Sequence, residues 1–200
     1  MNLTFNVRIV LTLNVRYMKT IIISGLGNPG KEYAKTRHNA GFLFTDYIRS
    51  INRDNFPDWE FNKKINGDIS AGKVDGKKII LFKPQTFMNL SGTAVSAAKK
   101  YYKVKLEDII VVHDEIDLPL GSFRFSVGSS AAGHKGAENI IDALGTKNFL
   151  RLRIGVDNRG DKKIPTEKYV LGKFLPAEMK IISKVLLESS EKIKQFISNF

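Results

Sequence analysis

The sequence predicts a single α/β domain whose sheet mixes parallel and antiparallel pairing. Short β-branched or apolar runs alternate with segments that carry apolar residues at helical spacing. A dipeptide typical of a tight turn joins two of the runs, which predicts an antiparallel pair. Helical segments separate most of the others, which is typical of parallel strands. The chain has 200 residues, of which 42% are hydrophobic, so it is long and apolar enough to bury one core.

The first half of the chain predicts a strand, a helix and a hairpin. The β-branched run Thr20–Ile23 is a strand that ends at a glycine-rich turn. From Asn39 onward, helical spacing is shown by Phe42, Phe44, Tyr47, Ile48 and Ile51. Segments 65–74 and 77–82 flank Asp75-Gly76, a dipeptide typical of a type I′ turn, and therefore predict a β-hairpin.

The second half continues the alternation. Ser91 is expected to cap a helix through its hydroxyl, with an apolar stripe formed by Ala94, Val95, Ala98, Tyr101 and Tyr102. Strands are predicted at 109–112, 123–127 and 150–156, with a helix over 135–144. Pro176 begins a C-terminal helix, which is expected to pack on the core through Ile182, Val185, Leu186, Ile193, Phe196 and Ile197.

The composition narrows the classes of function. The 32 Lys+Arg against 20 Asp+Glu give a charge of +12, which favours a polyanionic partner such as nucleic acid or an acidic membrane surface. No stretch approaches the ~20 apolar residues that span a bilayer, so we expect a soluble, cytoplasmic protein. Cysteine is absent, which excludes disulfides and thiolate catalysis, and with only three histidines we expect no metal and no cofactor.

Residues 1–17 are expected to be an N-terminal extension, separate from a domain that spans residues 18–200. The extension contains two arginines and no acidic residue, so a targeting peptide has to be considered. Its apolar stretch is short and interrupted, no small-residue cleavage site follows, and Met18-Lys19 precedes the first strand. A misassigned upstream start therefore fits better, and a real additional strand is the alternative.

Gly25, Gly27 and Gly30 match G-x-G-x-x-G, the fingerprint of dinucleotide-binding domains. A dinucleotide-dependent oxidoreductase is thus one alternative function. Its context is missing, because polar residues 31–37 delay the helix and Asp46, the acid at suitable spacing, lies inside that helix. The glycines do supply a sharp turn that presents Asn28, an amide able to donate and to accept.

Four loops carry the unusual chemistry, and each follows a predicted strand: residues 25–38, 83–92, 113–121 and 128–136. Ligands gather beyond the carboxyl ends of strands in open α/β sheets. These loops therefore line one cleft if the strands run parallel.

His38 is the candidate general base, because it lies at the mouth of a helix and an imidazole has a pKa of ~6.5. A lone loop histidine is usually a surface residue, but carboxylates follow a buried strand at Asp114, Glu115 and Asp117. One of these acids could accept the Nδ1 proton of His38 and fix its tautomer. For His113 and Glu115, a purely structural role is the alternative to a role in catalysis. Without a G-x-S-x-G elbow or a cysteine, direct attack by water is the economical mechanism.

Two loops offer substrate contacts. Asn89 follows Phe87-Met88, and an apolar pair beside an amide could hold a peptide or a terminal base, although burial of the pair in the core fits the spacing equally well. The loop 128–136 precedes a helix, whose free amides suit a phosphate. A phosphate clamp could come from nearby basic residues, although such residues on strands are usually just solvated: Arg124, Lys135, Lys147, Arg151 and Arg153.

Four segments in order resemble the bacterial-type peptidyl-tRNA hydrolases: GLGNPGKEYAKTRHNAGF, KPQTFMNLSG, HDEIDLPLG, and GHKG followed by RLRIG. The similarity runs from Met18 to the C-terminal helix. It implies a monomeric single-domain α/β protein, with a twisted mixed β-sheet flanked by helices on both faces and with no metal. The implied activity is hydrolysis of the ester bond of peptidyl-tRNA, so the implied partner is tRNA.

The resemblance also implies roles for matching positions. His38 would be the base, Asp114 the acid that orients it, and Asn28 a residue that distinguishes blocked from unblocked substrate. Substrate or tRNA contacts are implied at Tyr33, Phe87, Asn89, Arg124 and Arg153. The alternative function is a non-catalytic RNA-binding relative of the same fold, against which the intact set of catalytic and amide residues speaks.

Two positions depart from the family pattern. Lys135 stands where many relatives have the asparagine of GHNG, which the resemblance links to placing water or the tRNA end. An ammonium has donors only, so Lys135 could neutralise phosphate or the developing oxyanion but could not accept a proton from water. Ser126 occupies a position where a second clamp lysine is common, so the contact with the 5′-phosphate is expected either to be weaker or to use Lys147 or Arg151 instead.

Overall fold

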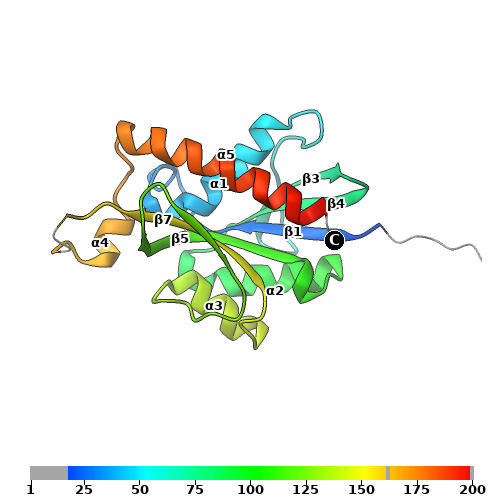
Figure 1. Ribbon diagram of the computed structural model, residues 1–200. Helices are drawn as coiled ribbons and strands as arrows, with labels where there is room; N and C mark the ends of the chain where they lie inside the picture. The colour runs from blue at the N-terminus through cyan, green and yellow to red at the C-terminus, as the bar shows by residue number, and fades with distance from the viewer. Residues whose placement is uncertain (1–17, 161–162, 199–200) are drawn as a thin grey trace, which may run out of the picture.

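A seven-stranded mixed sheet in the order β2-β3-β4-β1-β5-β7-β6 forms the centre of the molecule (Figure 1). The computed structural model describes residues 18–160 and 163–198, and the predicted extension 1–17 lies outside the described residues. The strands are β1 (Thr20–Gly25), β2 (Glu60–Asn62), β3 (Gly67–Val74), β4 (Lys77–Pro84), β5 (Ile109–Pro119), β6 (Phe123–Ser126) and β7 (Leu150–Asp157). Parallel pairing joins β4, β1, β5 and β7, and antiparallel pairs flank them on both sides.

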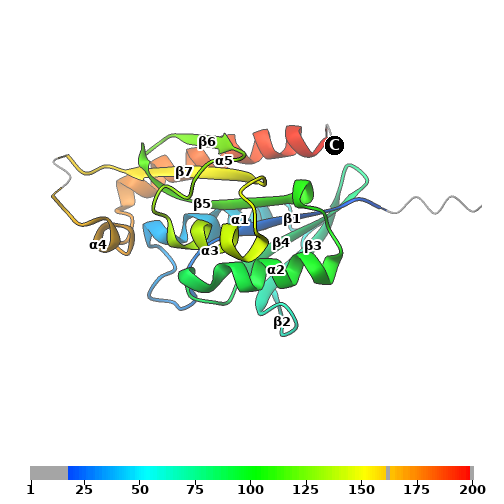
Figure 2. The same cartoon turned by 90° about the horizontal axis from the view of Figure 1, so that it is seen from below.

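Helices cover both faces of this sheet, as Figures 1 and 2 show. The helices are α1 (Ala40–Ile51), α2 (Ser91–Tyr102), α3 (Lys135–Leu144), α4 (Thr166–Val170) and α5 (Pro176–Ser198), and the 3-10 turns are η1 (Arg37–Asn39), η2 (Met88–Leu90) and η3 (Leu106–Asp108). One face packs against α1 and α5, the other against α2 and α3, and α4 lies beyond the end of β7. The predicted fold class is confirmed.

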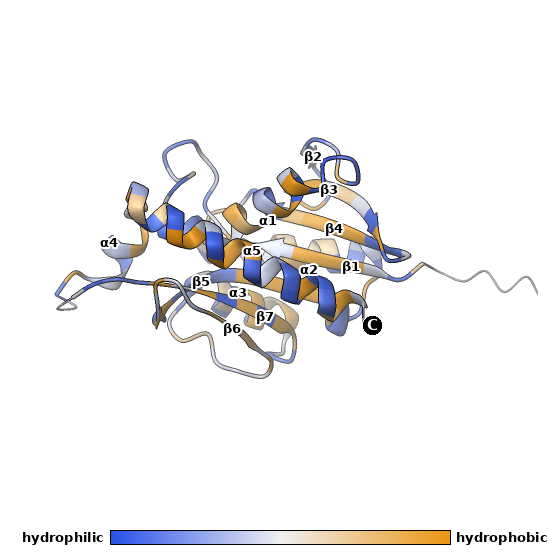
Figure 3. Cartoon of the chain, turned by 45° about the horizontal axis from the view of Figure 1, so that its top comes forward, coloured by the Kyte–Doolittle hydropathy of each residue, from blue (hydrophilic) through white to orange (hydrophobic). Residues whose placement is uncertain are grey.

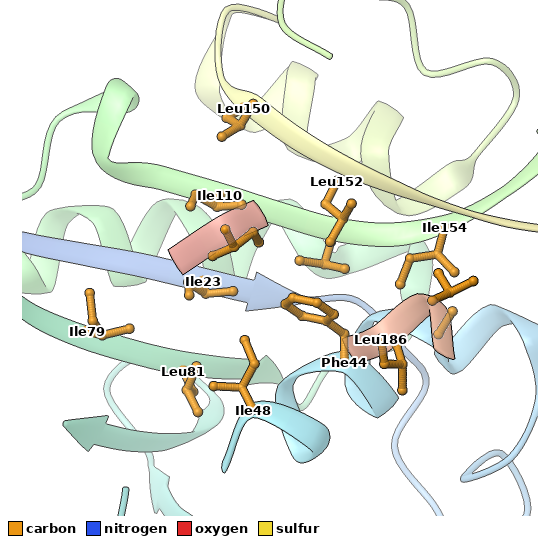
Figure 4. Close-up of a cluster of buried hydrophobic side chains, with 14 of the residues drawn as sticks. Ile23, Phe44, Ile48, Ile79, Leu81, Ile110, Leu150, Leu152, Ile154 and Leu186 are labelled. Carbon is orange, nitrogen blue, oxygen red and sulfur yellow. The ribbon is translucent and has the colours of Figure 1, made fainter. Parts of the chain in front are cut away.

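The strand β1 contributes to both cores because successive side chains on a strand point to opposite faces. Ile21 and Ile23 pack with α1 and α5, whereas Ile22 packs with α2 and α3. Figure 4 shows Ile23 close to Phe44 of α1. A strand buried on both faces has a continuous apolar sequence. Figure 3 shows β4 mostly in the hydrophobic colour, whereas hydrophobic and hydrophilic residues alternate along α5.

The predicted hairpin and the helix over 135–144 are confirmed. β3 and β4 pair antiparallel with Val74 opposite Lys77, and the two residues between them, Asp75 and Gly76, have φ angles of 48° and 75°. Positive φ at both central residues is the requirement of a type I′ turn. The two-residue turn therefore sets the register of the β3–β4 pair.

The expected capping role of Ser91 is wrong. α2 begins at Ser91 itself, the residue at the cap is Leu90, and no side chain caps the helix. The Ser91 hydroxyl instead donates to the carbonyl of Met88 at 2.8 Å. The 3-10 turn η2 runs directly into α2, so the serine lies one residue too late to act as a cap.

Other expectations failed at exposed or charged positions. Tyr101 and Phe196 were assigned to buried stripes, but their exposed fractions are 45% and 38%. β5 does not end at residue 112 but continues to Pro119, because the carboxylates of Asp114 and Glu115 have basic partners that allow them to stay in the strand. The short elements β2 and α4 were not predicted.

Candidate active site

A cleft of about 810 Å³ opens where the loops after β1 and β4 meet the second half of β5. It is lined by Asn28, His38, Phe87, Met88, Asn89, Asp114, Glu115, Ile116, Asp117, Ala132, Gly133, His134, Lys135, Thr166, Glu167, Val170 and Leu171. The predicted convergence of the four loops is therefore confirmed. Of the predicted site residues, Tyr33, Arg124 and Arg153 do not line this cleft.

Close packing of two glycines brings the start of α1 onto the sheet. A Cβ atom on Gly25 would lie 2.1 Å from the carbonyl oxygen of Gly41, and one on Gly41 would lie 2.2 Å from the carbonyl oxygen of Val112. A Cβ on Gly27 would lie 2.6 Å from the ring of Phe42. Two glycines of the G-x-G-x-x-G pattern thus serve helix–sheet packing, which places η1 and His38 above β5.

Asp114 is a buried carboxylate shared by two histidines. Nδ1 of His38 lies 2.9 and 3.1 Å from its two oxygens, and Nε2 of His134 lies 2.8 Å from one of them. Asp114 is 2% exposed. The expected contact between His38 and an acid of the 114–117 run is therefore present, and the acid is Asp114.

The hydrogen bonds fix the tautomers of both histidines. The backbone N–H of Ala137 donates to Nδ1 of His134, so the proton of His134 is on Nε2 and is donated to Asp114. His38 donates from Nδ1, which leaves Nε2 with a lone pair. His38 lines the cleft, so this lone pair belongs to a ring that substrate and water can reach.

The electrostatics of the pair favour a charged Asp114. Burial alone would raise the pKa of Asp114, but the charges and hydrogen bonds of His38 and His134 outweigh it and hold the pKa well below its usual range. Burial lowers the pKa of His38, and the charge and hydrogen bond of Asp114 more than offset this, so that pKa is raised above its ordinary value. The carboxylate therefore stabilises an imidazolium on His38.

All three histidines of the chain meet around Asp114. The ring of His134 lies 4.9 Å from that of His38 and 4.5 Å from that of His113, centre to centre. His113 is fully buried and donates from Nδ1 to the carbonyl of Asp114, which agrees with its structural alternative. Burial, followed by the neighbouring His134, holds the pKa of His113 well below its ordinary value.

His134 was missed by the sequence reasoning. It lies in the GHKG segment, directly before α3, and caps that helix. The signal that could have found it is its position at a helix N-terminus in a chain with only three histidines.

Among the described residues, His38, Asp114 and His134 also form a set whose nitrogen and oxygen atoms lie close enough to hold a metal ion. Each of these atoms is already accounted for by a hydrogen bond, since the two histidines donate to the carboxylate. The expectation of no metal stays a prediction.

Asn28 is held at the floor of the cleft with a defined orientation. Its Oδ1 accepts from the backbone N–H of Met88 at 2.8 Å, so its Nδ2 amide is the group left for a ligand. The side chain of Asn39 brackets the backbone of Asn28, accepting from its N–H and donating to its carbonyl, both at 2.9 Å. Asn39 is a supporting residue that the sequence reasoning missed.

The two residues of the apolar pair Phe87-Met88 have different environments, one matching the predicted substrate contact and the other the predicted burial in the core. Phe87 is 57% exposed at the cleft, whereas Met88 is 4% exposed and belongs to the core beside α2 and α3. Asn89 is exposed and also lines the cleft. An exposed ring next to an amide is suited to contact a base or an apolar peptide side chain.

Comparison with known proteins identifies the family. The peptidyl-tRNA hydrolase family model matches residues 22–200. The peptidyl-tRNA hydrolase of Aquifex aeolicus is 46% identical over 82% of this chain and 83% of that protein, and that of Trichlorobacter lovleyi is 45% identical over 84% of each. The chain belongs to the peptidyl-tRNA hydrolase family. The crystal structure of peptidyl-tRNA hydrolase from Acinetobacter baumannii has a TM-score of 0.79 to it and 34% identity, covering 88% of this chain and 87% of that one.

Membership of the peptidyl-tRNA hydrolase family confirms the predicted enzyme class, a hydrolase acting on peptidyl-tRNA. It also removes the dinucleotide-dependent oxidoreductase, whose only support was a glycine pattern now explained by packing. Within residues 18–160 and 163–198, none of the helices is long and apolar enough to cross a membrane.

The basic residues predicted for the phosphate of tRNA fall into different environments. Arg151 is fully buried and donates to the carbonyls of Ser129 and Ser130, so its expected phosphate contact is wrong. Arg153 is bound by the buried carboxylate of Glu115, with Nε 2.8 Å from Oε2. Arg124 lies opposite Arg153 in the β6–β7 pair and is exposed.

Lys135 lies at the mouth of the cleft in the first turn of α3. Its side chain is 72% exposed, and its Nζ is 3.6 Å from the carboxylate of Glu138. Exposed ion pairs of this kind contribute little stability, so the ammonium can exchange Glu138 for a phosphate at small cost.

Proposed function

We propose that this chain hydrolyses peptidyl-tRNA by direct attack of water, with His38 as the general base. One observation carries the proposal: Nδ1 of His38 is bound to the buried Asp114, which leaves Nε2 as the basic atom in the cleft. The arrangement has the two elements of base catalysis, a histidine within reach of substrate and an acid that fixes its tautomer.

In the proposed reaction, Nε2 of His38 takes a proton from water as the water oxygen attacks the ester carbonyl carbon. The resulting tetrahedral intermediate collapses when the bond to the ribose oxygen breaks, and the imidazolium returns the proton to that oxygen. The products are tRNA with a free hydroxyl and the peptide carboxylic acid, which keeps the second hydrogen of the water and then releases it to solvent as a proton to give the carboxylate. Asp114 stabilises the imidazolium, and the bond from His134 keeps this carboxylate oriented.

The proposed substrate contacts follow from the exposure of each group. Asn28 offers an amide donor to the acyl part of the substrate, which could distinguish a blocked from a free amine, and Phe87 and Asn89 contact the peptide or the terminal base. Tyr33 lies on the loop before His38 and outside the cleft, so its proposed contact is with the RNA.

For the tRNA phosphates we propose Lys135, Arg124 and Arg153. Arg124 and Lys135 are exposed, and Arg153 contributes through the part of its guanidinium that Glu115 does not bind. We further propose that the protein acts as a monomer, without a metal, in the cytoplasm. Sedimentation and activity after treatment with a chelator test the first two statements.

The decisive experiment compares N-acetyl-aminoacyl-tRNA with the same aminoacyl-tRNA carrying a free amine. We expect the blocked substrate to be hydrolysed, the free one to remain largely intact, and His38→Ala to reduce turnover by about 10³-fold, the range of general base catalysis. Exposed Lys100→Ala is the matched control and should keep full activity. Full activity of His38→Ala would remove the histidine from the mechanism, and tRNA binding without turnover of any blocked substrate would favour the non-catalytic alternative.

A further inference from the structure

Arg37, the residue before His38, is a buried cation with well-defined partners. It is 7% exposed. One terminal nitrogen donates to both carboxylate oxygens of Glu178 at 2.8 and 2.7 Å, and the other donates to the carbonyl of Lys173 at 3.1 Å. Its Cζ atom lies 4.2 Å from the ring centre of Tyr169. A buried charge is unfavourable unless it is paired, so any other position of the Arg37 side chain that breaks these contacts would be higher in free energy.

The partners of Arg37 belong to one wall of the cleft. Tyr169 is part of α4, and the same short helix contributes Thr166, Glu167 and Val170 to the cleft lining. The hydroxyl of Tyr169 donates to the carbonyl of Val156 at 3.0 Å, which ties α4 to the end of β7. Two contacts of Tyr169 therefore fix the position of α4, one with the end of β7 and one with Arg37.

Backbone contacts join the same two segments. The N–H of Arg37 donates to the carbonyl of Gly172 at 3.0 Å, and the N–H of Phe174 donates to the carbonyl of Lys35 at 2.9 Å. A Cβ atom on Gly172 would lie 3.2 Å from Nη1 of Arg37, so the glycine allows the guanidinium to approach. The turn η1, which carries His38, is thus fastened to the segment between α4 and α5.

We propose that Arg37 and Glu178 are positioning residues for the hydrolysis. Their ion pair holds η1 against α4 and the start of α5, and this keeps Nδ1 of His38 at 2.9 Å from Asp114. Neither residue lines the cleft, and α4 is also held to β7 by the hydroxyl of Tyr169, so the ion pair acts on the reaction through η1 and His38. A displacement of a catalytic group by about 1 Å can cost on the order of 10²-fold in rate. The inference rests on the proposed role of His38 as the base.

Two variants test the ion pair. Glu178→Gln keeps the shape and one acceptor but removes the charge, and Arg37→Lys keeps the charge but loses the planar fork. We expect kcat for N-acetyl-aminoacyl-tRNA to fall at least about 10-fold in each, with KM within about twofold, because base alignment is lost and substrate contacts remain.

The pH profile is the second measurement, because a loss of stability alone would not move it. The rate rises with pH as His38 loses its proton, and the contact with Asp114 raises the pKa of His38. A loosened contact therefore moves the acid limb to lower pH. The other titratable groups around His38 are His134, Glu115, Asp117, Glu167 and Lys135, and both variants leave them unchanged.

Ile193→Ala is the matched control. Ile193 is buried in the same helix α5, but its hydrocarbon side chain takes no part in the ion pair between Arg37 and Glu178. It should lower the melting temperature while leaving kcat and the acid limb unchanged. The proposal is overturned if Glu178→Gln keeps the wild-type kcat and acid limb, or if Ile193→Ala reproduces its losses. His38→Ala is assayed in parallel: if it is inactive while Glu178→Gln is normal, only this inference fails, and if it is active the base assignment fails as well.

Discussion

The centre of the cleft and its basic rim are built in opposite ways. In the centre, formed by His38, Asp114 and His134, each hydrogen bond fixes the direction of the next, and Asp114 is 2% exposed. At the rim, the side chain of Lys135 is 72% exposed and forms a surface ion pair with Glu138 at 3.6 Å. The difference indicates that the centre depends on the exact geometry of its hydrogen bonds, whereas the contribution of the rim to tRNA binding depends on its positive charge.

The strongest test of the centre is Asp114→Asn. An amide carries no charge to stabilise an imidazolium, and its Nδ2 can donate to Nδ1 of His38, so the tautomer of His38 is no longer fixed. We expect kcat to fall by about 10³-fold to 10⁴-fold, the size of effect known for loss of an orienting aspartate. Single-turnover hydrolysis of N-acetyl-aminoacyl-tRNA measures it, and circular dichroism checks the fold. A loss below about 10-fold would show that the carboxylate does not act through His38.

The second test separates the two roles of His134. In His134→Asn, the asparagine can still cap α3 by accepting from Ala137, but it cannot reproduce the bond from Nε2 to Asp114. Hydrogen bonds to charged groups contribute about 1.5–3 kcal/mol, which corresponds to a fall in kcat of about 10-fold to 100-fold. The bond to Asp114 is also lost from the stability of the fold, so the melting temperature should fall by a few degrees even though the cap is kept. A normal kcat at this reduced stability would show that the bond from His134 to Asp114 stabilises the fold and does not orient the carboxylate for catalysis.

The third test concerns the packing that places the centre. In Gly41→Ala the added methyl would lie 2.2 Å from the carbonyl oxygen of Val112 and 2.3 Å from the amide of Leu26, both parts of the backbone. We expect about 3 kcal/mol of destabilisation in denaturant unfolding, together with reduced kcat. Gly160→Ala is the control, because a Cβ there meets no atom within 4 Å. Equal stabilities of the two variants would contradict the close approach.

A further test uses the pH dependence of the reaction, because His38 and Asp114 in the centre have shifted pKa values. The raised pKa of His38 places the acid limb of kcat/KM above the pKa of a free histidine, and NMR of the His38 ring should give the same pKa. The raised pKa also contributes stability that is present below the unfolded pKa and is lost as pH rises through the folded one. The lowered pKa of Asp114 contributes stability above the unfolded carboxyl pKa, lost as pH falls through its folded pKa. An acid limb below the pKa of a free histidine would contradict the pairing.

The smallest effect is expected at the rim. Lys135→Asn removes one phosphate contact, so the slope of log affinity for tRNA against log salt should decrease by about one, with kcat within about twofold. Filter binding at several salt concentrations measures the slope. An unchanged slope with a collapsed kcat would show that Lys135 belongs to the centre.

The sequence predicted the elements with strong local signals, because those signals act between neighbouring residues. Asp75-Gly76 sets its turn by itself, and the β-branched run of β1 is apolar enough to be buried on both faces. His38 was found because the histidine precedes a helix and a run of carboxylates lies at the end of a buried strand. The run left open which acid orients His38, and only the family resemblance indicated Asp114.

Other features depend on contacts between segments far apart in the chain, which periodicity does not record. His134 looks like an ordinary loop histidine until α3 brings it to Asp114. Arg151 looks like a surface cation of a strand, yet the loop before α3 covers it and supplies two carbonyls. The helix α4 has only five residues, too few for a periodic pattern, although it forms a wall of the cleft.

Because two histidines share Asp114, the site can form only at a late stage of protein synthesis. One histidine precedes α1, the other precedes α3, and the aspartate lies on the strand between them in sequence. No fragment emerging from the ribosome has the trio until α3 has been synthesised and docked, and Arg37 must still wait for Glu178 of the last helix. With the roles proposed above, catalytic competence is acquired late in synthesis, and a chain that ends before α5 is expected to be inactive.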